Sequence, residues 1–281
     1  MNDREKQKAF EESEKRITET ISNIKNRIAV FSGKGGVGKT TISVNLAFAM
    51  QLEGYTTGIL DADITGPNVA KMFGIEDRLA ARDNVIVPFR KYGLKIISIA
   101  GILVPGQPVI WRGPMRSKMI SQFLADVDWG ELDFLIADLP PGTGDEILTI
   151  AQKMKPDYAV IVTTPQDVSI IDAERAINMA KELEIPAIGV IENMSGFVCP
   201  VCNSNIDLFG SGGGRTLADD CEVEFLGSIP IDIDARIMSD EGKSILHEKP
   251  ASELANCLKR MAQKIEHNIQ SGKINKEYVQ T

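Results

Sequence analysis

The sequence predicts an α/β fold in which a doubly wound, mostly parallel sheet is flanked by helices. Short apolar runs alternate with segments of helix length, and this alternation is typical of βαβ units. Polar residues follow several of the runs directly, and ligands of doubly wound sheets bind at that carboxyl edge. The predicted strands are 28–31, 58–60, 95–99, 134–137, 158–162 and 187–191.

Helix-length segments lie between several of these runs. The segment 40–52 is apolar nearly all round, so we expect that helix to be buried. The other predicted helices are 113–126, 144–154 and 168–184. Neither a repeat nor a long linker interrupts the pattern, which predicts one domain over residues 28–268. A glycine-rich stretch, 195–215, is predicted to be a loop that leaves the sheet.

Both ends of the chain differ from this central part. Residues 1–27 hold seven basic and six acidic side chains, so we expect a charged arm outside the core; a partner-docking helix is the alternative. Leu254, Leu258, Met261 and Ile265 recur at helical spacing, which favours a helix packed against the sheet. Residues 269–281 are expected to form a polar tail.

Composition excludes several classes of function. The net charge is −8, which argues against nucleic-acid binding and gives no support to binding at an anionic membrane. Only two histidines are present, so a histidine base or a multi-histidine metal site is nearly excluded. No apolar run is long enough to span a membrane, and the N-terminus does not resemble a secretory signal. We therefore expect a cytoplasmic protein whose four cysteines are thiols or ligands.

The most specific motif is GKGGVGKTT, between the first predicted strand and the first predicted helix. It fits the phosphate-binding pattern G-x-x-x-x-G-K-[ST] in the structural context that this pattern needs. Glycines let backbone N–H groups converge on a phosphate, and the helix adds its positive end. Lys39 would reach the β- and γ-phosphates of ATP, and the Thr40 hydroxyl would bind Mg²⁺. The predicted loop residues are Gly33, Lys34, Gly35, Gly36, Val37, Gly38, Lys39, Thr40 and Thr41.

Carboxylates that follow predicted strands are candidates for the metal site. Phosphoryl transfer needs a metal ion to neutralise charge and a group that orients the attacking water. Asp138 ends an apolar strand and is the natural Walker B carboxylate, acting on Mg²⁺ through water. Asp61 and Asp63 follow another strand. For any one of these aspartates, a turn or a helix cap is the structural alternative.

A single C-x-x-C motif is formed by Cys199 and Cys202. It could be a redox dithiol, half of a zinc site or half of an iron–sulfur site. Two thiolates leave a tetrahedral metal or a cluster under-ligated, but a symmetric dimer supplies four sulfurs. Zn²⁺ would satisfy the same four, so the ligand count leaves both open. Cys221 and Cys257 lack such spacing and are expected to be ordinary thiols.

The glycine-rich loop resembles the deviant Walker A loop of the MinD, ParA and nitrogenase iron protein group of P-loop NTPases. This resemblance implies that Lys34 reaches across a homodimer to the partner's nucleotide, so that ATP joins two subunits face to face. It also implies that Asp61 assists the metal shell and that Asp63 positions the attacking water.

Over residues 28–246, the chain more specifically resembles the Mrp/ApbC-type ATPases, which carry iron–sulfur clusters to apoproteins. The resemblance implies a labile [4Fe–4S] cluster bridged between subunits by Cys199 and Cys202. It further implies that Asn193 contacts the adenine, with Pro230 and Ile231 walling the base. The stretches that carry it are GKGGVGKTT, DADITGPN, VIWRGPM, DLPPGTGD, ENMSGFVCPVC and GSIPIDIDAR.

The function expected from these motifs is that of a slowly hydrolysing, Mg²⁺-dependent ATPase that carries a cluster to apo iron–sulfur proteins. Two alternatives stay open. One is a MinD- or ParA-like positioning ATPase on membrane or DNA, against which the charge and the tail argue. The other is a zinc-bridged dimer switched by nucleotide. The role of Trp111 and Arg112, within VIWRGPM, stays open.

Overall fold

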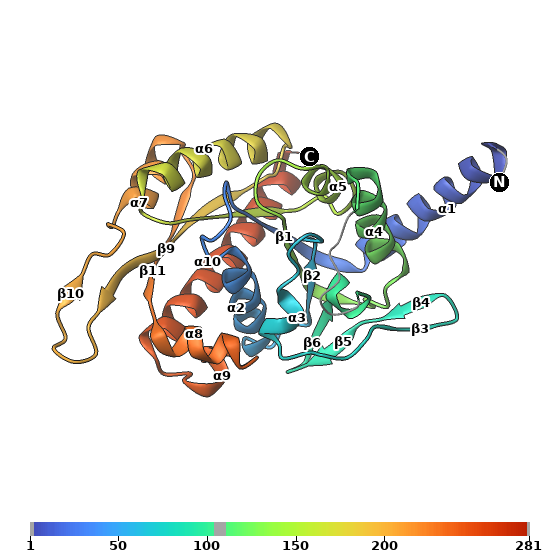
Figure 1. The fold of residues 1–281 in the computed structure, drawn as a ribbon. Helices are drawn as coiled ribbons and strands as arrows, with labels where there is room; N and C mark the ends of the chain where they lie inside the picture. The colour runs from blue at the N-terminus through green and yellow to red at the C-terminus, as the bar shows by residue number, and fades with distance from the viewer. Residues whose placement is uncertain (1–2, 104–110, 280–281) are drawn as a thin grey trace.

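The computed structural model describes residues 3–103 and 111–279. Within them, a nine-stranded sheet is the centre of the fold (Figure 1). Its order is β10-β9-β8-β1-β7-β2-β6-β5, with β11 also paired to β9. The pairs are parallel except β5 with β6 and β9 with β10. The strands are β1 (Ile24–Phe31), β2 (Thr57–Asp61), β5 (Phe89–Lys91), β6 (Leu94–Ile97), β7 (Leu132–Asp138), β8 (Tyr158–Thr163), β9 (Ile188–Val198), β10 (Asn205–Ile206) and β11 (Glu224–Ile231); β3 (Ala80–Arg82) and β4 (Val85–Val87) form a separate hairpin.

Helices cover both faces of the sheet, so the doubly wound fold is confirmed. Alternate residues of each strand point to opposite faces: on β1, Ala29 belongs to one buried cluster and Val30 to the other. The first cluster packs under α1 (Asp3–Ser22), α4 (Gly113–Asp126), α5 (Asp145–Lys153), α6 (Asp167–Glu182) and α7 (Gly213–Asp220). The second packs under α2 (Lys39–Leu52), α3 (Val69–Met72), α8 (Ile233–Asp240), α9 (Ile245–Glu248) and α10 (Glu253–Val279).

The ends of the central strands place the polar residues that follow them side by side. Asp61 at the end of β2 pairs in register with Asp138 at the end of β7, and Val30 of β1 flanks Asp138 on the other side. Thr163 pairs in the same way with Glu192. The carboxyl edge of the sheet therefore gathers charged groups that lie far apart in the sequence.

The N-terminal segment packs against the sheet and α4 and is not only a charged arm outside the core. β1 begins at Ile24, four residues before the expected boundary, because Ile24 already pairs with Leu132 of β7. In α1, Ile17 is buried and Arg16 pairs with Asp126 of α4. Figure 1 shows the first turns of α1 projecting away from the rest of the molecule.

The C-terminal segment forms one long helix that packs on the sheet. The apolar stripe from Leu254 to Ile265 is buried, as its spacing predicts. α10 continues to Val279, and Ile269 is buried as well. The expected polar tail 269–281 thus begins inside the helix, because the apolar stripe extends one turn further; residues 280–281 lie outside the described residues. Over the described chain, every helix is too short or too polar to cross a membrane.

The stretch 195–215 is only partly a loop. β9 continues to Val198 and pairs with β10, so the cysteines lie at the turn of a β-hairpin that extends from the sheet (Figure 1). The return from this hairpin leads into α7. The prediction of a loop missed the hairpin because cross-strand pairing, and not an apolar run, defines it.

The VIWRGPM stretch packs against the helix that follows Asp138. Gly113 begins α4, and a side chain there would collide with Asp145 at the start of α5. Arg116 forms an ion pair of 2.8 Å with Glu146, whose side chain is 2% exposed. Trp111 is half-buried against the first core cluster, whereas Val109 and Ile110 lie outside the described residues.

We predict that Arg116→Met destabilises the protein, because it leaves the buried Glu146 carboxylate unpaired. The expected loss is about 2–3 kcal/mol of unfolding free energy, below the range for a fully buried pair because Arg116 is 26% exposed. Equilibrium urea unfolding measures it. The double variant Arg116→Met/Glu146→Met should recover most of the loss; a single variant with the wild-type midpoint would contradict the prediction.

Candidate functional site: a phosphate loop and a cysteine turn

The loop between β1 and α2 has the backbone that a phosphate cradle requires. Gly36 and Gly38 have φ values of 83° and 86°, a region that side chains rarely adopt. Gly38 is also the N-cap of α2, and a Cβ there would collide with the Asn193 amide. Gly35 and Gly36 are exposed, and Val37 is buried. The loop therefore presents its backbone beside the positive end of α2.

Asp138 is the centre of the polar cluster at the first turn of α2. Its carboxylate is fully buried and accepts hydrogen bonds from Lys39 Nζ at 2.8 Å and Thr40 Oγ1 at 2.7 Å. Ser43 Oγ donates a third bond at 2.6 Å. Lys39 is itself 7% exposed, so its charge compensates that of Asp138 inside the protein. The lysine and the hydroxyl that the motif assigns to phosphate and Mg²⁺ thus both lie on the predicted Walker B carboxylate.

Asp61 lies beside Asp138 and is also fully buried. Its carboxylate accepts hydrogen bonds from Ser98 Oγ at 2.8 Å and from the backbone N–H of Val69 at 3.2 Å. Burial, followed by the charge of Asp138, raises the pKa of Asp61 to about 8. Two adjacent buried carboxylates form a site where added positive charge would be strongly favoured.

Asp63 and Lys34 lie in less restricted surroundings. The Asp63 carboxylate accepts hydrogen bonds from Thr65 Oγ1 at 2.9 Å and the Gly66 N–H at 3.0 Å, so it holds a turn after β2. Lys34 is half-buried, and Nζ makes no ion pair or hydrogen bond to any described residue. Gly33 is packed against α6, where a side chain would collide with Asp172.

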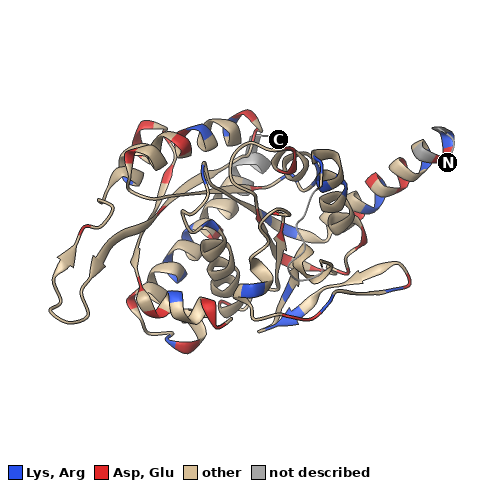
Figure 2. Cartoon of the chain, in the orientation of Figure 1, with Lys and Arg blue, Asp and Glu red and all other residues tan. Residues whose placement is uncertain are grey.

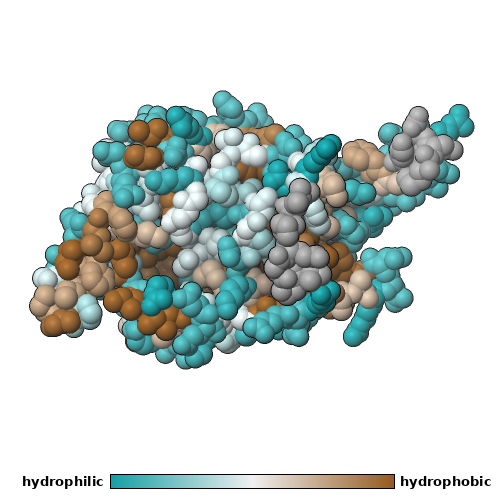
Figure 3. Space-filling model, in the orientation of Figure 1, coloured by the Kyte–Doolittle hydropathy of each residue, from teal (hydrophilic) through white to brown (hydrophobic). Residues whose placement is uncertain are grey.

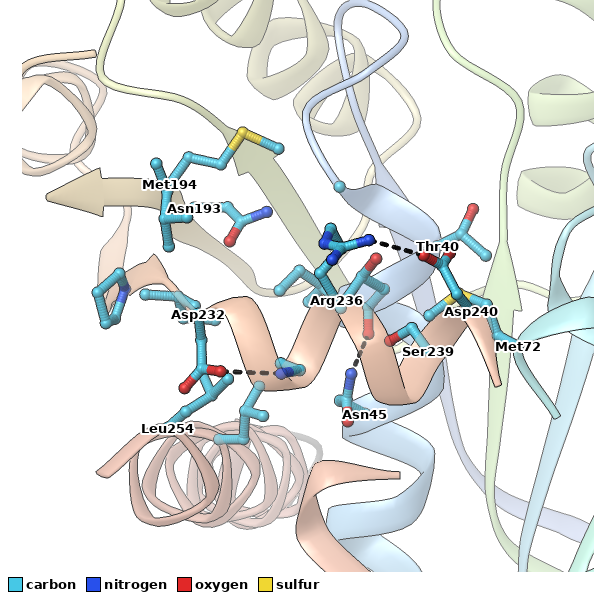
Figure 4. A pocket seen from close by; sticks show the side chains of 18 of the residues that line it. Thr40, Asn45, Met72, Asn193, Met194, Asp232, Arg236, Ser239, Asp240 and Leu254 are labelled. Carbon is cyan, nitrogen blue, oxygen red and sulfur yellow. Dashed lines mark hydrogen bonds and ion pairs between the residues drawn. The ribbon is translucent and has the colours of Figure 1, made fainter. Parts of the chain in front are cut away.

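A cavity of about 560 Å³ opens beside the loop and is large enough for a small ligand. Figure 4 shows the side chains that line it, with Asn193 and Met194 opposite Thr40. Asn193 Nδ2 donates to the Val37 carbonyl at 2.9 Å, which ties β9 to the loop. Six predicted nucleotide-binding residues line the cavity: Gly38, Thr40, Thr41, Asn193, Pro230 and Ile231.

Other lining residues were missed in the sequence. α8 contributes Arg236 and Asp240, which form an ion pair of 3.1 Å at the cavity (Figure 4). Asp232 caps α8 by accepting from the Ala235 N–H at 2.8 Å, and Asn45 of α2 also faces the cavity. The stretch GSIPIDIDAR contains Asp232 and Arg236, so its charged residues were the available signal.

The cysteine pair occupies the turn between β9 and β10. The Cys199 N–H donates to Ser204 O at 3.0 Å, and the Asn203 N–H donates to Cys199 O at 2.9 Å. Cys202 Sγ lies 3.0 Å from Ser204 Oγ. Hydrogen bonds from the side chain and then the backbone of Ser204 lower the pKa of the Cys202 thiol, which favours the thiolate that metals bind. Cys202 is exposed and Cys199 half-buried.

The surface around this turn is apolar and uncharged. Residues 193–206 contain no charged side chain, and Figure 2 shows the hairpin almost free of Lys, Arg, Asp and Glu. Figure 3 shows hydrophobic side chains gathered over the same hairpin. Those that are exposed include Val198, Val201, Ile206, Leu208 and Phe209, of which Val201 is 91% exposed. Such a patch marks an interaction surface.

Comparison with solved structures confirms the fold. A nucleotide-binding protein from Archaeoglobus fulgidus, solved in complex with ADP, is 40% identical, with a TM-score of 0.74; the match covers 86% of this chain and 95% of that one. The cell-division ATPase MinD of Pyrococcus furiosus is 23% identical, with a TM-score of 0.64 over 86% of this chain and 99% of that one. The second match supports the fold alone.

Comparison of sequences confirms the expected family. The iron-sulfur cluster carrier protein of Methanocaldococcus jannaschii is 51% identical over 266 residues, covering 92% of this chain and 91% of the relative. The ParA family model described as NUBPL iron-transfer P-loop NTPase matches residues 23–266. With the phosphate loop and the cysteine turn in place, these matches show that the chain belongs to the NUBPL-type iron-transfer P-loop NTPase family.

Proposed function

We propose that the protein is an ATP-binding, slowly hydrolysing carrier that holds a labile [4Fe–4S] cluster between two subunits and transfers it to apo iron–sulfur proteins. The observation that carries this proposal is the pair of thiols, Cys199 and Cys202, on an exposed turn whose strand starts at the nucleotide cavity. The name of the 51% identical relative supports the same cargo.

Nucleotide binding would reorganise the polar cluster on Asp138. Lys39 would leave that carboxylate for the β- and γ-phosphates, and the backbone N–H groups of the loop would hold the same phosphates. Asp138 would then be free to bind the water shell of Mg²⁺, together with Thr40 and with Asp61 alongside. The metal would supply the positive charge that the two buried carboxylates lack once the lysine has moved.

Two further residues complete the proposed ATPase site. We assign water positioning to Asp63, which becomes available when the turn that it now holds, through Thr65 and Gly66, opens. Lys34 would act on the nucleotide of the other subunit, a role supported by an ammonium group that no described residue engages. The adenine would lie against Asn193, Pro230 and Ile231, which line the cavity.

Dimerisation would complete the cysteine site. Each chain offers two thiols, and a twofold axis through the turn would bring four sulfurs together. The exposed Val198 and Val201 beside the cysteines would be buried in the same contact. A cluster with two ligands from each chain at the surface can be released to a client. Zinc would fit the same four sulfurs and is an outcome of the test below.

The partners and compartment follow from this activity. The clients would be apo iron–sulfur proteins, with neither nucleic acid nor membrane involved, in keeping with the net charge of −8. A reducing cytoplasm suits the four cysteines, all of which are free thiols.

One prediction of this proposal concerns the cargo. Anaerobic reconstitution of the wild type should give a brown dimer with about four irons and four sulfides and visible charge-transfer absorption. The variant Cys199→Ala/Cys202→Ala should stay colourless and fail to activate an apo-enzyme, because no cluster ligands remain.

Its matched control is Cys221→Ala/Cys257→Ala, which removes two thiols elsewhere and should reconstitute normally. Cluster transfer by Cys199→Ala/Cys202→Ala at the wild-type rate would refute the proposal. Zinc without sulfide in protein purified anaerobically would favour the zinc-bridged dimer.

Another prediction of this proposal concerns Lys34. With a slowly hydrolysed ATP analogue, Lys34→Ala should remain monomeric in light scattering under conditions where the wild type dimerises. Its ATPase rate should fall by about tenfold or more, because a cation that stabilises the transition state in trans is lost. The exposed Lys243→Ala, outside the loop, should behave as wild type. Unchanged dimerisation and ATPase of Lys34→Ala would exclude the trans role.

A further inference from the structure

A single strand connects the nucleotide cavity to the cysteine turn. β9 runs from Ile188 to Val198, so Cys199 follows its last residue. Asn193, within the strand, donates to Val37 of the phosphate loop at 2.9 Å and lines the cavity. Five residues therefore separate Asn193, which lines the cavity, from the first cysteine.

This part of β9 is bent and not a regular strand. Met194 and Gly196 have φ values of 59° and 81°, and the register with β11 shifts between Ile229 and Ile231. A methionine in the left-handed region is uncommon and persists where its surroundings hold it. Met194 also lines the cavity, so the bend borders the nucleotide site.

Glu192 fastens this bend from inside the protein. Its carboxylate is fully buried and accepts hydrogen bonds from Ser195 Oγ at 2.5 Å, the Gly212 N–H at 3.0 Å and the Gly214 N–H at 2.6 Å. Ser228 Oγ of β11 lies at 3.4 Å. No described cation forms an ion pair with Glu192; its charge is met by neutral donors and by the N-terminus of α7.

These donors come from the chain segments before and after the cysteine turn. Ser195 lies on the arm that leaves the sheet, and Gly212 and Gly214 lie where the chain returns to start α7. Gly214 packs so closely that an added Cβ would lie 2.9 Å from Glu192 Cβ. Because one buried carboxylate holds both segments, a displacement at Asn193 would reach the hairpin from both of its ends.

We propose that Glu192 is a positioning residue that couples occupancy of the nucleotide cavity to the conformation of the cysteine turn. Nucleotide moves the phosphate loop and Asn193, Glu192 moves with its neighbour, and the segments on either side of the hairpin follow. The inference rests on the proposed function only for its consequence, the control of cluster release; the coupling itself concerns the metal-free chain.

The test measures thiol reactivity in the metal-free protein. Cys199 and Cys202 are alkylated with iodoacetamide, with and without the Mg²⁺ complex of a slowly hydrolysed ATP analogue. Mass spectrometry separates their peptide from those of Cys221 and Cys257. In the wild type, nucleotide should change the alkylation rate by about fivefold or more, the lower end of ordinary coupling between sites.

Glu192→Gln should reduce this nucleotide effect to less than about twofold, because an amide N–H₂ cannot accept from all of these donors. Its nucleotide Kd should stay within about twofold of wild type, since Glu192 does not line the cavity. Ser195→Ala removes only the bond to the outgoing arm and should reduce the effect in part; it serves as the test if Glu192→Gln does not fold.

The matched control is Glu224→Gln, the same substitution at the other end of the same strand pair, where Glu224 of β11 lies opposite Gly189 of β9. It should keep the wild-type nucleotide effect. The proposal is overturned if the folded Glu192→Gln or Ser195→Ala protein keeps the full nucleotide effect on alkylation. It is also overturned if Glu224→Gln loses the effect as completely as Glu192→Gln, or if nucleotide does not change the alkylation rate of the wild type. None of these outcomes depends on whether a cluster binds, so failure of the carrier function is distinguishable.

Discussion

The buried carboxylate of Asp138 is the group on which the arrangement of the site depends. Burying a charged group away from water is unfavourable unless the group is paired and hydrogen-bonded. Asp138 meets this condition through Lys39, Thr40 and Ser43. All three donors belong to the first turns of α2, whereas Asp138 ends β7. The interaction therefore holds the start of α2 over the edge of the sheet. The loop between β1 and α2 is positioned by the same contact, because it leads directly into that helix.

Asp61 makes the same edge of the sheet unusually dependent on positive charge. It lies in register with Asp138, and burial together with that neighbour raises its pKa to about 8, so Asp61 holds a proton near neutral pH and ionises fully only when more positive charge is brought close. Lys39 supplies positive charge to this pair through its hydrogen bond to Asp138. Binding of a metal ion with the nucleotide would replace that lysine as the source of positive charge, which gives a physical reason for linking phosphate and metal binding.

The cysteine turn does not share a pocket with this edge of the sheet; strand β9 connects the two. β9 carries Glu192 and Asn193 at the sheet edge and then continues as an uncharged hairpin to Cys199. Glu192 accepts hydrogen bonds from Ser195 on β9 and from the backbone at the start of α7, after the hairpin. β9 thus borders the cavity through Asn193 and ends directly before Cys199, with Glu192 bonded to the segments on either side of the turn.

The sequence by itself determined the features that depend on neighbouring residues. The alternation of strands and helices, the phosphate loop and the cysteine spacing are local patterns and could be read from it, and Asp138 could be recognised from its place at the end of an apolar run. The strand order, and the contacts of Asp138 with α2, could not. Only the tertiary structure decided that Arg116 meets Glu146, that Arg236 and Asp240 face the cavity, and that Glu192 accepts from the start of α7. Each of these contacts joins residues from separate elements. Such contacts depend on how the helices and strands pack, and local residue patterns do not encode that packing.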